Sequence, residues 1–141
     1  MCFAGRTAFA RGVGDELKPA PVLPDCGLLL VNPGVALATR DVFAARRGKF
    51  SVVAPVRGWR DLVDFCELLR ARDNDLTLAA MSLQPAIGEV LERLRRADGV
   101  RHAAMSGSGA TCFALFDDLA RAERAAAGLP AKWWRHLGRF A

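Results

Sequence analysis

The chain has 141 residues, half of them hydrophobic and a quarter charged, which is typical of one ordinary globular domain. Its net charge is +5, but the basic residues are dispersed and no aromatic residues interleave with them, so we expect solvated helix faces and no nucleic-acid partner. A weak attraction for phosphorylated substrates is the alternative. We expect a cytoplasmic protein without a membrane partner, because the sequence has neither a membrane-length apolar run nor a secretory signal.

The first segments are extended. Residues 3–13 alternate loosely between apolar and polar or small side chains, which predicts a strand or a short hairpin. Pro19, Pro21 and Pro24 then indicate an extended connector, because proline disfavours both helices and central strands. The apolar run of residues 28–31 is typical of a buried strand, and it ends at the turn signal of residues 32–34.

Helical patterns follow. Thr39 or Asp41 could cap a short helix that runs through Arg47. Residues 59–71 carry an apolar stripe with helical spacing, which Asn74 and Asp75 interrupt. A longer helix is predicted over residues 76–96, and Pro85 should either start its second part or kink it.

The last third predicts strand, strand, helix and strand. Residues 100–105 and 111–116 are strand-like, Asp117 or Asp118 should cap a helix ending before Gly128, and residues 132–140 form a last strand. This order predicts an α+β fold in which helices pack on one face of an antiparallel sheet. The four cysteines are far apart and only two histidines are present, so we expect reduced cysteines and no metal site.

The segment with the most chemical information is Ser106–Ala110, between two predicted strands. Its two glycines permit backbone angles that other residues avoid, and successive N–H groups in such a turn can bind an anion. On local chemistry alone, such a pattern is more often a tight turn that only joins two strands.

Residues 101–116 closely resemble the third conserved motif of the GHMP kinase superfamily. Residues 3–17 resemble the end of that superfamily's N-terminal domain, residues 30–43 its substrate-side segment, and residues 74–76 the opening of one of its helices. The match is nearest to the branch that phosphorylates diphosphocytidyl-methylerythritol in non-mevalonate isoprenoid synthesis.

The resemblance implies a GHMP kinase C-terminal, ferredoxin-like domain over residues 25–141, preceded by a remnant of the N-terminal kinase domain and a linker over residues 1–24. It implies transfer of the γ-phosphate of ATP, with Mg²⁺, to the 2-hydroxyl of diphosphocytidyl-methylerythritol. It assigns an active-site loop and two substrate-binding residues, which are Ser106, Gly107, Ser108 and Gly109 for the loop, and Thr39 and Phe43 for the substrate. Phe43 could stack on the cytosine ring, or it could be an ordinary core residue.

Three parts of the superfamily's machinery have no match here: its lysine motif, its phosphate loop and its catalytic aspartate segment. We therefore expect no catalytic residue and no metal ligand in this chain, a missing N-terminal kinase domain as its partner, and no activity alone. We also expect the coding frame to continue upstream of Met1. Two alternatives remain: a stand-alone α+β binding module, and an interaction protein whose Ser106–Ala110 loop is only a turn.

Overall fold

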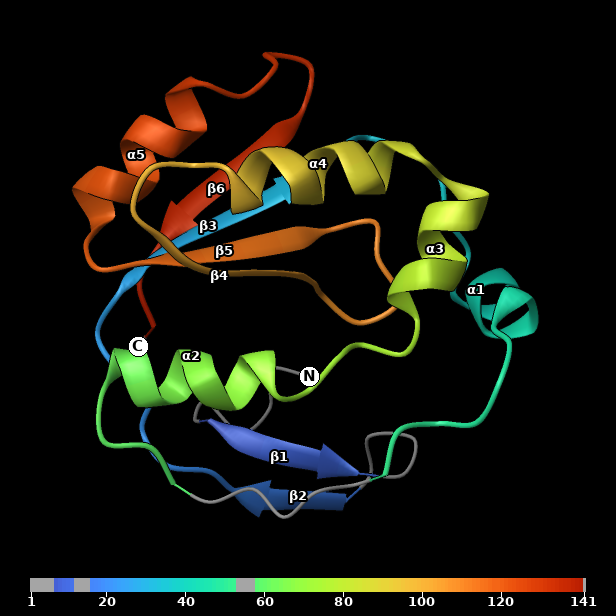
Figure 1. The fold of residues 1–141 in the computed structure, drawn as a ribbon, viewed down its shortest axis with the longest axis horizontal. Coiled ribbons are helices and arrows are strands. Elements are labelled where there is room, and N and C mark those ends of the chain that lie inside the picture. The colour runs from blue at the N-terminus through green and yellow to red at the C-terminus, as the bar shows by residue number, and fades with distance from the viewer. Residues whose placement is uncertain (1–6, 12–15, 53–57, 141) are drawn as a thin grey trace.

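The computed structural model describes residues 7–11, 16–52 and 58–140. Its main element is a four-stranded antiparallel sheet in the order β4-β5-β3-β6 (Figure 1). The strands are β3 (Gly27–Asn32), β4 (Val100–Met105), β5 (Cys112–Phe116) and β6 (Trp134–Gly138). Strands β4 and β6 are its edges. No helix within the described ranges has the length and apolar character to span a membrane.

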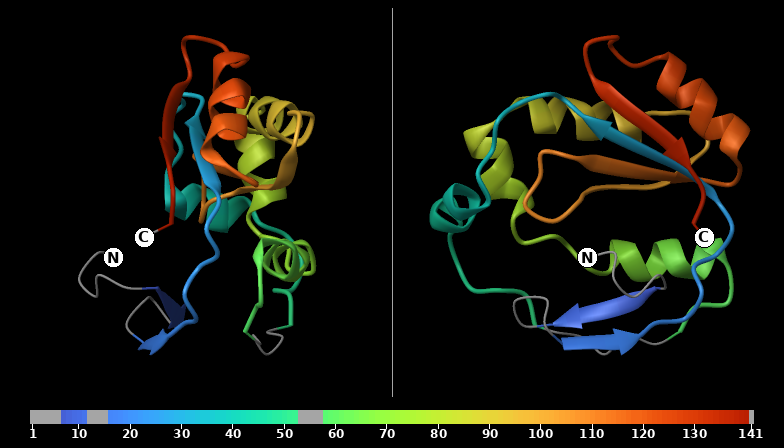
Figure 2. Two further views of the ribbon diagram at one scale, coloured as in Figure 1. Left: turned by 90° about the vertical axis from the view of Figure 1, so that its left-hand side faces the viewer. Right: turned by 180° about the vertical axis from the view of Figure 1, so that it is seen from behind.

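In the part of the chain that the structure describes, five helices accompany the sheet: α1 (Thr39–Ala45), α2 (Leu62–Arg70), α3 (Thr77–Leu83), α4 (Ala86–Arg95) and α5 (Leu119–Ala127). Successive side chains along each strand point to opposite faces of the sheet. Ala114 and Phe116 belong to the large core with the apolar faces of α4 and α5, which lie on the same side of the sheet (Figure 2). The predicted α+β fold with helices over an antiparallel sheet is confirmed.

The position of α2 was not evident from its apolar stripe. Phe65 and Cys66 of α2 form a second, smaller cluster with Leu115, whose side chain lies on the face opposite to that of Ala114 and Phe116. Helix α2 thus covers part of the second face of the sheet, in addition to the face covered by α4 and α5.

Most predicted helix boundaries agree with the structure. The carboxylate of Asp118 accepts a hydrogen bond from the N–H of Arg121 and caps α5, and Pro85 separates α3 from α4. The cap predicted for α1 is wrong: Ala38 is the N-cap and makes no side-chain bond, and the helix ends at Ala45. The hydroxyl of Thr39 is engaged elsewhere, with consequences described below.

The chain's first strand has a partner nearby. Strand β1 (Ala8–Arg11) pairs antiparallel with β2 (Glu16–Pro19), which agrees with the strand or short hairpin expected in this segment. The connector was expected to begin at Pro19, but Pro19 is the last residue of β2, where it leaves the other pairs intact. Part of the predicted strand, residues 3–6 and 12–13, lies outside the described residues. The division at residue 24 stays a prediction.

A bidentate ion pair links β4 to the end of β5. The guanidinium of Arg101 donates to both carboxylate oxygens of Asp117 at 2.7 Å, and this bonding holds the pKa of Asp117 below its ordinary value of 3.8. A carboxyl with a depressed pKa in the folded state stabilises the fold above its unfolded pKa, and that contribution is lost as the pH falls through the folded pKa.

We expect Asp117→Asn to lower the free energy of unfolding by about 0.5–1 kcal/mol at pH 7, since the pair is partly solvated. The difference from the parent should vanish well below pH 3.8, where the parent carboxyl is also neutral. Urea unfolding at both pH values measures it. Asp98→Asn is the control, because Asp98 has no ion pair among the described residues. An undiminished difference at low pH would contradict an electrostatic origin.

Candidate functional site

The loop between β4 and β5, residues 106–111, is a compact turn. Ser106 N donates to the carbonyl of Thr111 at 2.9 Å, and Gly109 N donates to the carbonyl of Ser106 at 3.0 Å. Gly107 and Gly109 both have positive φ, +55° and +90°. Both glycines therefore adopt the left-handed backbone angles that the sequence pattern indicated.

Asn74 holds this loop from the side of α3. Its amide nitrogen donates to the carbonyl oxygens of Met105, at 3.1 Å, and Gly107, at 2.8 Å. Its amide oxygen accepts a hydrogen bond from the N–H of Leu76 at 3.0 Å, which organises the start of α3. Both polar atoms of the Asn74 side chain are thus hydrogen-bonded, the nitrogen to the loop and the oxygen to the start of α3. These bonds fix the position of the loop relative to α3.

Asn32 holds the other end of the loop. Its amide nitrogen donates to the hydroxyl of Thr111 at 2.9 Å, and its amide oxygen accepts from the N–H of Gly34 at 2.8 Å. Asn32 ends β3, so this bond ties the loop to the central strand of the sheet. The sequence segments around residues 32 and 74 therefore both reach the Ser106–Thr111 turn.

A third contact comes from α1. The hydroxyls of Thr39 and Ser108 lie 2.8 Å apart and share a hydrogen bond. Phe43 is one helical turn after Thr39, on the same side of α1. Its side chain is 51% exposed, so Phe43 is not the core residue that was the alternative interpretation. The structure thus brings Thr39 to the loop and leaves the Phe43 ring accessible nearby.

The loop retains hydrogen-bonding capacity. In the described part of the chain, the N–H groups of Gly107 and Ser108 donate to no other group. Gly107 is exposed and an added Cβ atom there would meet nothing within 4 Å, so this side of the loop is open. Adjacent free N–H groups at an open turn are suited to an anion such as a phosphate oxygen.

Sequence reasoning missed the anchoring roles of Asn32 and Asn74. A partial signal existed, since both residues lie in segments that were noted for their resemblance, but side-chain amides carry no pattern that identifies their partners. Asp75 was also missed. It accepts hydrogen bonds from the N–H of Ser51, at 2.8 Å, and from the Ser51 hydroxyl, and these bonds hold the pKa of Asp75 below its ordinary value.

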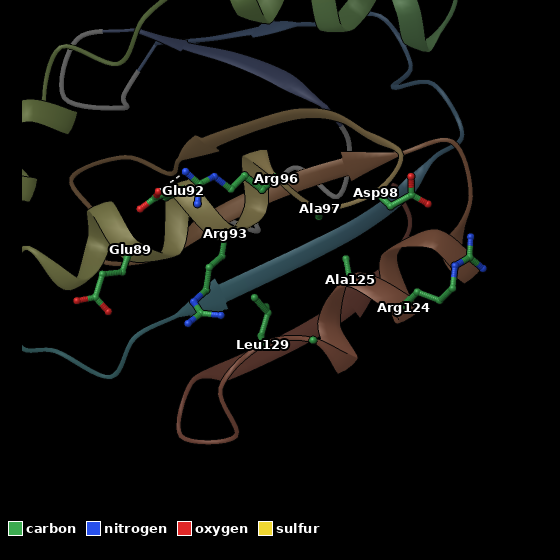
Figure 3. Close-up of a pocket in the computed structure, with 10 residues that line it drawn as sticks. Glu89, Glu92, Arg93, Arg96, Ala97, Asp98, Arg124, Ala125 and Leu129 are labelled. Atoms are coloured by element: carbon green, nitrogen blue, oxygen red, sulfur yellow. Dashed lines mark ion pairs between the residues drawn. The ribbon is translucent and has the colours of Figure 1, made fainter.

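A surface hollow of about 680 Å³ lies between α4 and α5 and contains no residue of the loop (Figure 3). Glu89 and Arg124 lie at opposite ends of it, and Glu92 pairs with Arg96 at 2.8 Å. Its charged residues are evenly divided between three carboxylates and three guanidiniums. This balance and the absence of loop residues from its lining give it no part in the site.

Comparison with known proteins identifies the fold. The family model described as "GHMP kinases C terminal" matches residues 52–135, which is more than half of the chain. The chain belongs to the GHMP kinase C-terminal family. A crystal structure of a 4-(cytidine 5'-diphospho)-2C-methyl-D-erythritol kinase superposes with a TM-score of 0.73 at 34% identity, and the match covers 97% of this chain and 50% of that one. A homoserine kinase from Cytophaga hutchinsonii, at 15% identity and a TM-score of 0.63, shares the fold.

Curated relatives of this GHMP kinase domain include two bacterial proteins named 4-diphosphocytidyl-2-C-methyl-D-erythritol kinase. The protein of Paramagnetospirillum magneticum is 46% identical over 138 residues, which covers 95% of this chain and 48% of the relative. That of Rhodopseudomonas palustris strain BisB18 is 45% identical and covers 98% of this chain and 49% of the relative. The chain therefore spans about half the length of the curated relatives it matches.

Proposed function

We propose that this chain is the C-terminal part of an ATP-dependent kinase that phosphorylates the 2-hydroxyl of 4-diphosphocytidyl-2-C-methyl-D-erythritol, in isoprenoid precursor synthesis. The observation that carries the proposal is the hydrogen bond between Thr39 and Ser108, which joins the expected substrate segment to the expected active-site loop. The names of the relatives at 41–46% identity support the same substrate.

In this proposal, Thr39 and Phe43 hold the cytidine end of the substrate. An exposed phenylalanine ring offers a flat apolar surface on which a base can stack. The free N–H groups of Gly107 and Ser108 face the phosphate groups. Residues 106–109 thereby position the reacting parts, and positioning together with charge neutralisation is most of what phosphoryl transfer requires.

ATP and Mg²⁺ supply the transferred phosphoryl group and neutralise its charge when they are bound. The N–H groups of Gly107 and Ser108 suit a phosphate oxygen, so these two residues of the chain would contact ATP. No group of three or more His, Cys, Asp or Glu side chains suited to a metal occurs within the described residues.

We further propose that residues 1–24 belong to an N-terminal kinase domain and that residues 25–141 form the C-terminal domain. Turnover should then require the other half. Fusing the N-terminal half of the Paramagnetospirillum relative to this chain should give ATP-dependent phosphorylation of the substrate, whereas the 141-residue chain alone should give none. Turnover by the chain alone, or none by a folded fusion, would contradict the proposal.

In the reconstituted enzyme, Phe43→Ala should raise the KM for the cytidyl substrate about tenfold with little change in kcat. The lost stacking surface contacts the substrate equally in the ground and transition states, and stacking is worth about 1–3 kcal/mol. Steady-state kinetics measures the effect. Val63→Ala on α2, at similar exposure, is the control and should change neither constant. A fall in kcat with unchanged KM would show that Phe43 has another role.

A stand-alone binding module remains the second candidate, because Thr39, Phe43 and Ser108 are already assembled within this chain. Titration of the 141-residue chain with cytidine diphosphate, followed by NMR, tests it. Saturable shifts at Phe43 without any activity in the fusion would favour this alternative over the kinase.

A further inference from the structure

A second hollow runs along the free edge of β4. Its volume is about 540 Å³, and the surrounding walls come from the end of α1, the end of α2, and α3. Its charged lining residues are Arg46, Arg47, Lys49, Arg70, Arg72, Arg95, Asp73 and Asp75. Six cationic side chains therefore face two carboxylates, unlike the balanced groove between α4 and α5.

The carboxylates offset only part of this charge. Asp75 accepts hydrogen bonds from Ser51 and keeps its negative charge, which interacts with the guanidinium of Arg46. Within the described ranges, no carboxylate pairs with Arg47, Lys49 or Arg95. Positive charge thus exceeds negative charge in a concave site, which attracts anions more strongly than a flat surface does.

The charge is concentrated around His102. Burial lowers the pKa of His102, and the positive charges of Arg70 and Arg95 lower it further, so both guanidiniums act on this ring. A smaller adjoining hollow of about 320 Å³ is lined by the same three side chains. Arg70 comes from α2 and Arg95 from α4, so two helices on different parts of the fold contribute cations to one place.

The strand itself offers a neutral donor. The carbonyl of Arg101 accepts a hydrogen bond from Arg70, and the carbonyl of Met105 accepts from Asn74, so both point away from the sheet. Successive residues of a strand direct their backbone N–H and C=O groups to alternate edges. Arg101, Ala103 and Met105 are every second residue, so their backbone groups point to the same edge. Its N–H therefore points to the free edge, into the hollow that Ala103 lines.

We propose that this basic hollow on the edge of β4 binds a phosphorylated small molecule that carries at least two negative charges. Arg70 and Arg95 provide charge-assisted hydrogen bonds to the phosphate oxygens, and the N–H of Ala103 provides a further donor. Arg47 and Lys49 line the same hollow and add to its positive field. The volume accommodates a group the size of pyrophosphate with part of its attached molecule. This site goes beyond the kinase proposal and does not depend on it.

Isothermal titration of the 141-residue chain with pyrophosphate tests the proposal. We expect saturable binding that weakens as salt is added. Arg95→Gln should weaken binding about tenfold, the loss expected for one charge-assisted hydrogen bond, and Asp73→Asn should strengthen it. Arg95 makes no ion pair among the described residues, so this change should leave the thermal unfolding temperature unaltered.

Arg124→Gln, in the groove between α4 and α5, removes the same charge elsewhere and should change the affinity less than twofold. An equal loss for Arg95→Gln and Arg124→Gln would show that only the net charge matters, and it would overturn the proposal. Absence of saturable binding at low salt would overturn it as well. Because Arg70 also bonds the β4 backbone, Arg70→Gln serves only as a confirming variant, with circular dichroism to verify folding.

Discussion

Gly109→Ala is expected to lower the free energy of unfolding by about 2–5 kcal/mol. Gly109 has a φ of +90°, and an added Cβ atom would lie 2.9 Å from the sulfur of Met105 and 3.2 Å from a methyl carbon of Leu37. The Met105 side chain is almost fully buried, so it has little room to move. Backbone strain and overpacking each contribute about 1–3 kcal/mol. Urea unfolding followed by circular dichroism measures the change.

Gly107→Ala is the matched control in the same loop. Its φ is +55°, but an added Cβ atom would meet nothing within 4 Å, so only the backbone cost of about 1 kcal/mol applies. If both variants lost the same stability, packing around Gly109 would not be the cause.

In the reconstituted kinase, Gly107→Val should abolish activity, because a branched side chain disfavours the positive φ that orients the loop.

Asn74→Asp should be the second severe change, with an expected loss of about 2–4 kcal/mol. The substitution keeps an oxygen acceptor for the N–H of Leu76, but it removes both hydrogen bonds donated to the Met105 and Gly107 carbonyls. A negative oxygen would then face two carbonyl oxygens, which leaves acceptors without a donor. Lowering the pH should recover part of the loss, because a protonated carboxyl regains one donor.

Asn32→Asp makes the same chemical change at the other end of the loop and should cost less than about 1 kcal/mol. The partner of the Asn32 amide nitrogen is the hydroxyl of Thr111, which can rotate and donate to a carboxylate. Unfolding measurements on both variants separate the two cases. Similar losses would show that hydroxyl rotation does not rescue the contact.

Much of the fold was predictable because it depends on local patterns. Asp118 before α5, Pro85 between two helices and the continuous apolar run of β5 each indicate one structure from a few neighbouring positions. The start of α1 was not predictable. Thr39 has good capping chemistry, but its hydroxyl bonds Ser108, which is 69 positions away, and local chemistry cannot reveal such a partner.

The site was predictable to a similar extent. Resemblance led to residues 106–109 and to Thr39 and Phe43, and the structure brings Thr39 against Ser108. The resemblance did not reveal why the loop keeps its shape, because Asn32 and Asn74 hold it through side-chain hydrogen bonds to residues far away in the sequence. The basic hollow on β4 was also hidden, since its cations are dispersed along the sequence and converge only when α1, α2 and α4 pack.

The order of the strands has a consequence for how the chain folds during synthesis. Strand β3 occupies the middle of the sheet, yet it is made first, and its two partners β5 and β6 follow more than 75 residues later. Both sides of β3 stay unpaired until those partners emerge, and long-range pairing of this kind is slow. A chain truncated before Trp134 would leave one side of β3 permanently open, and such an edge favours self-association over folding.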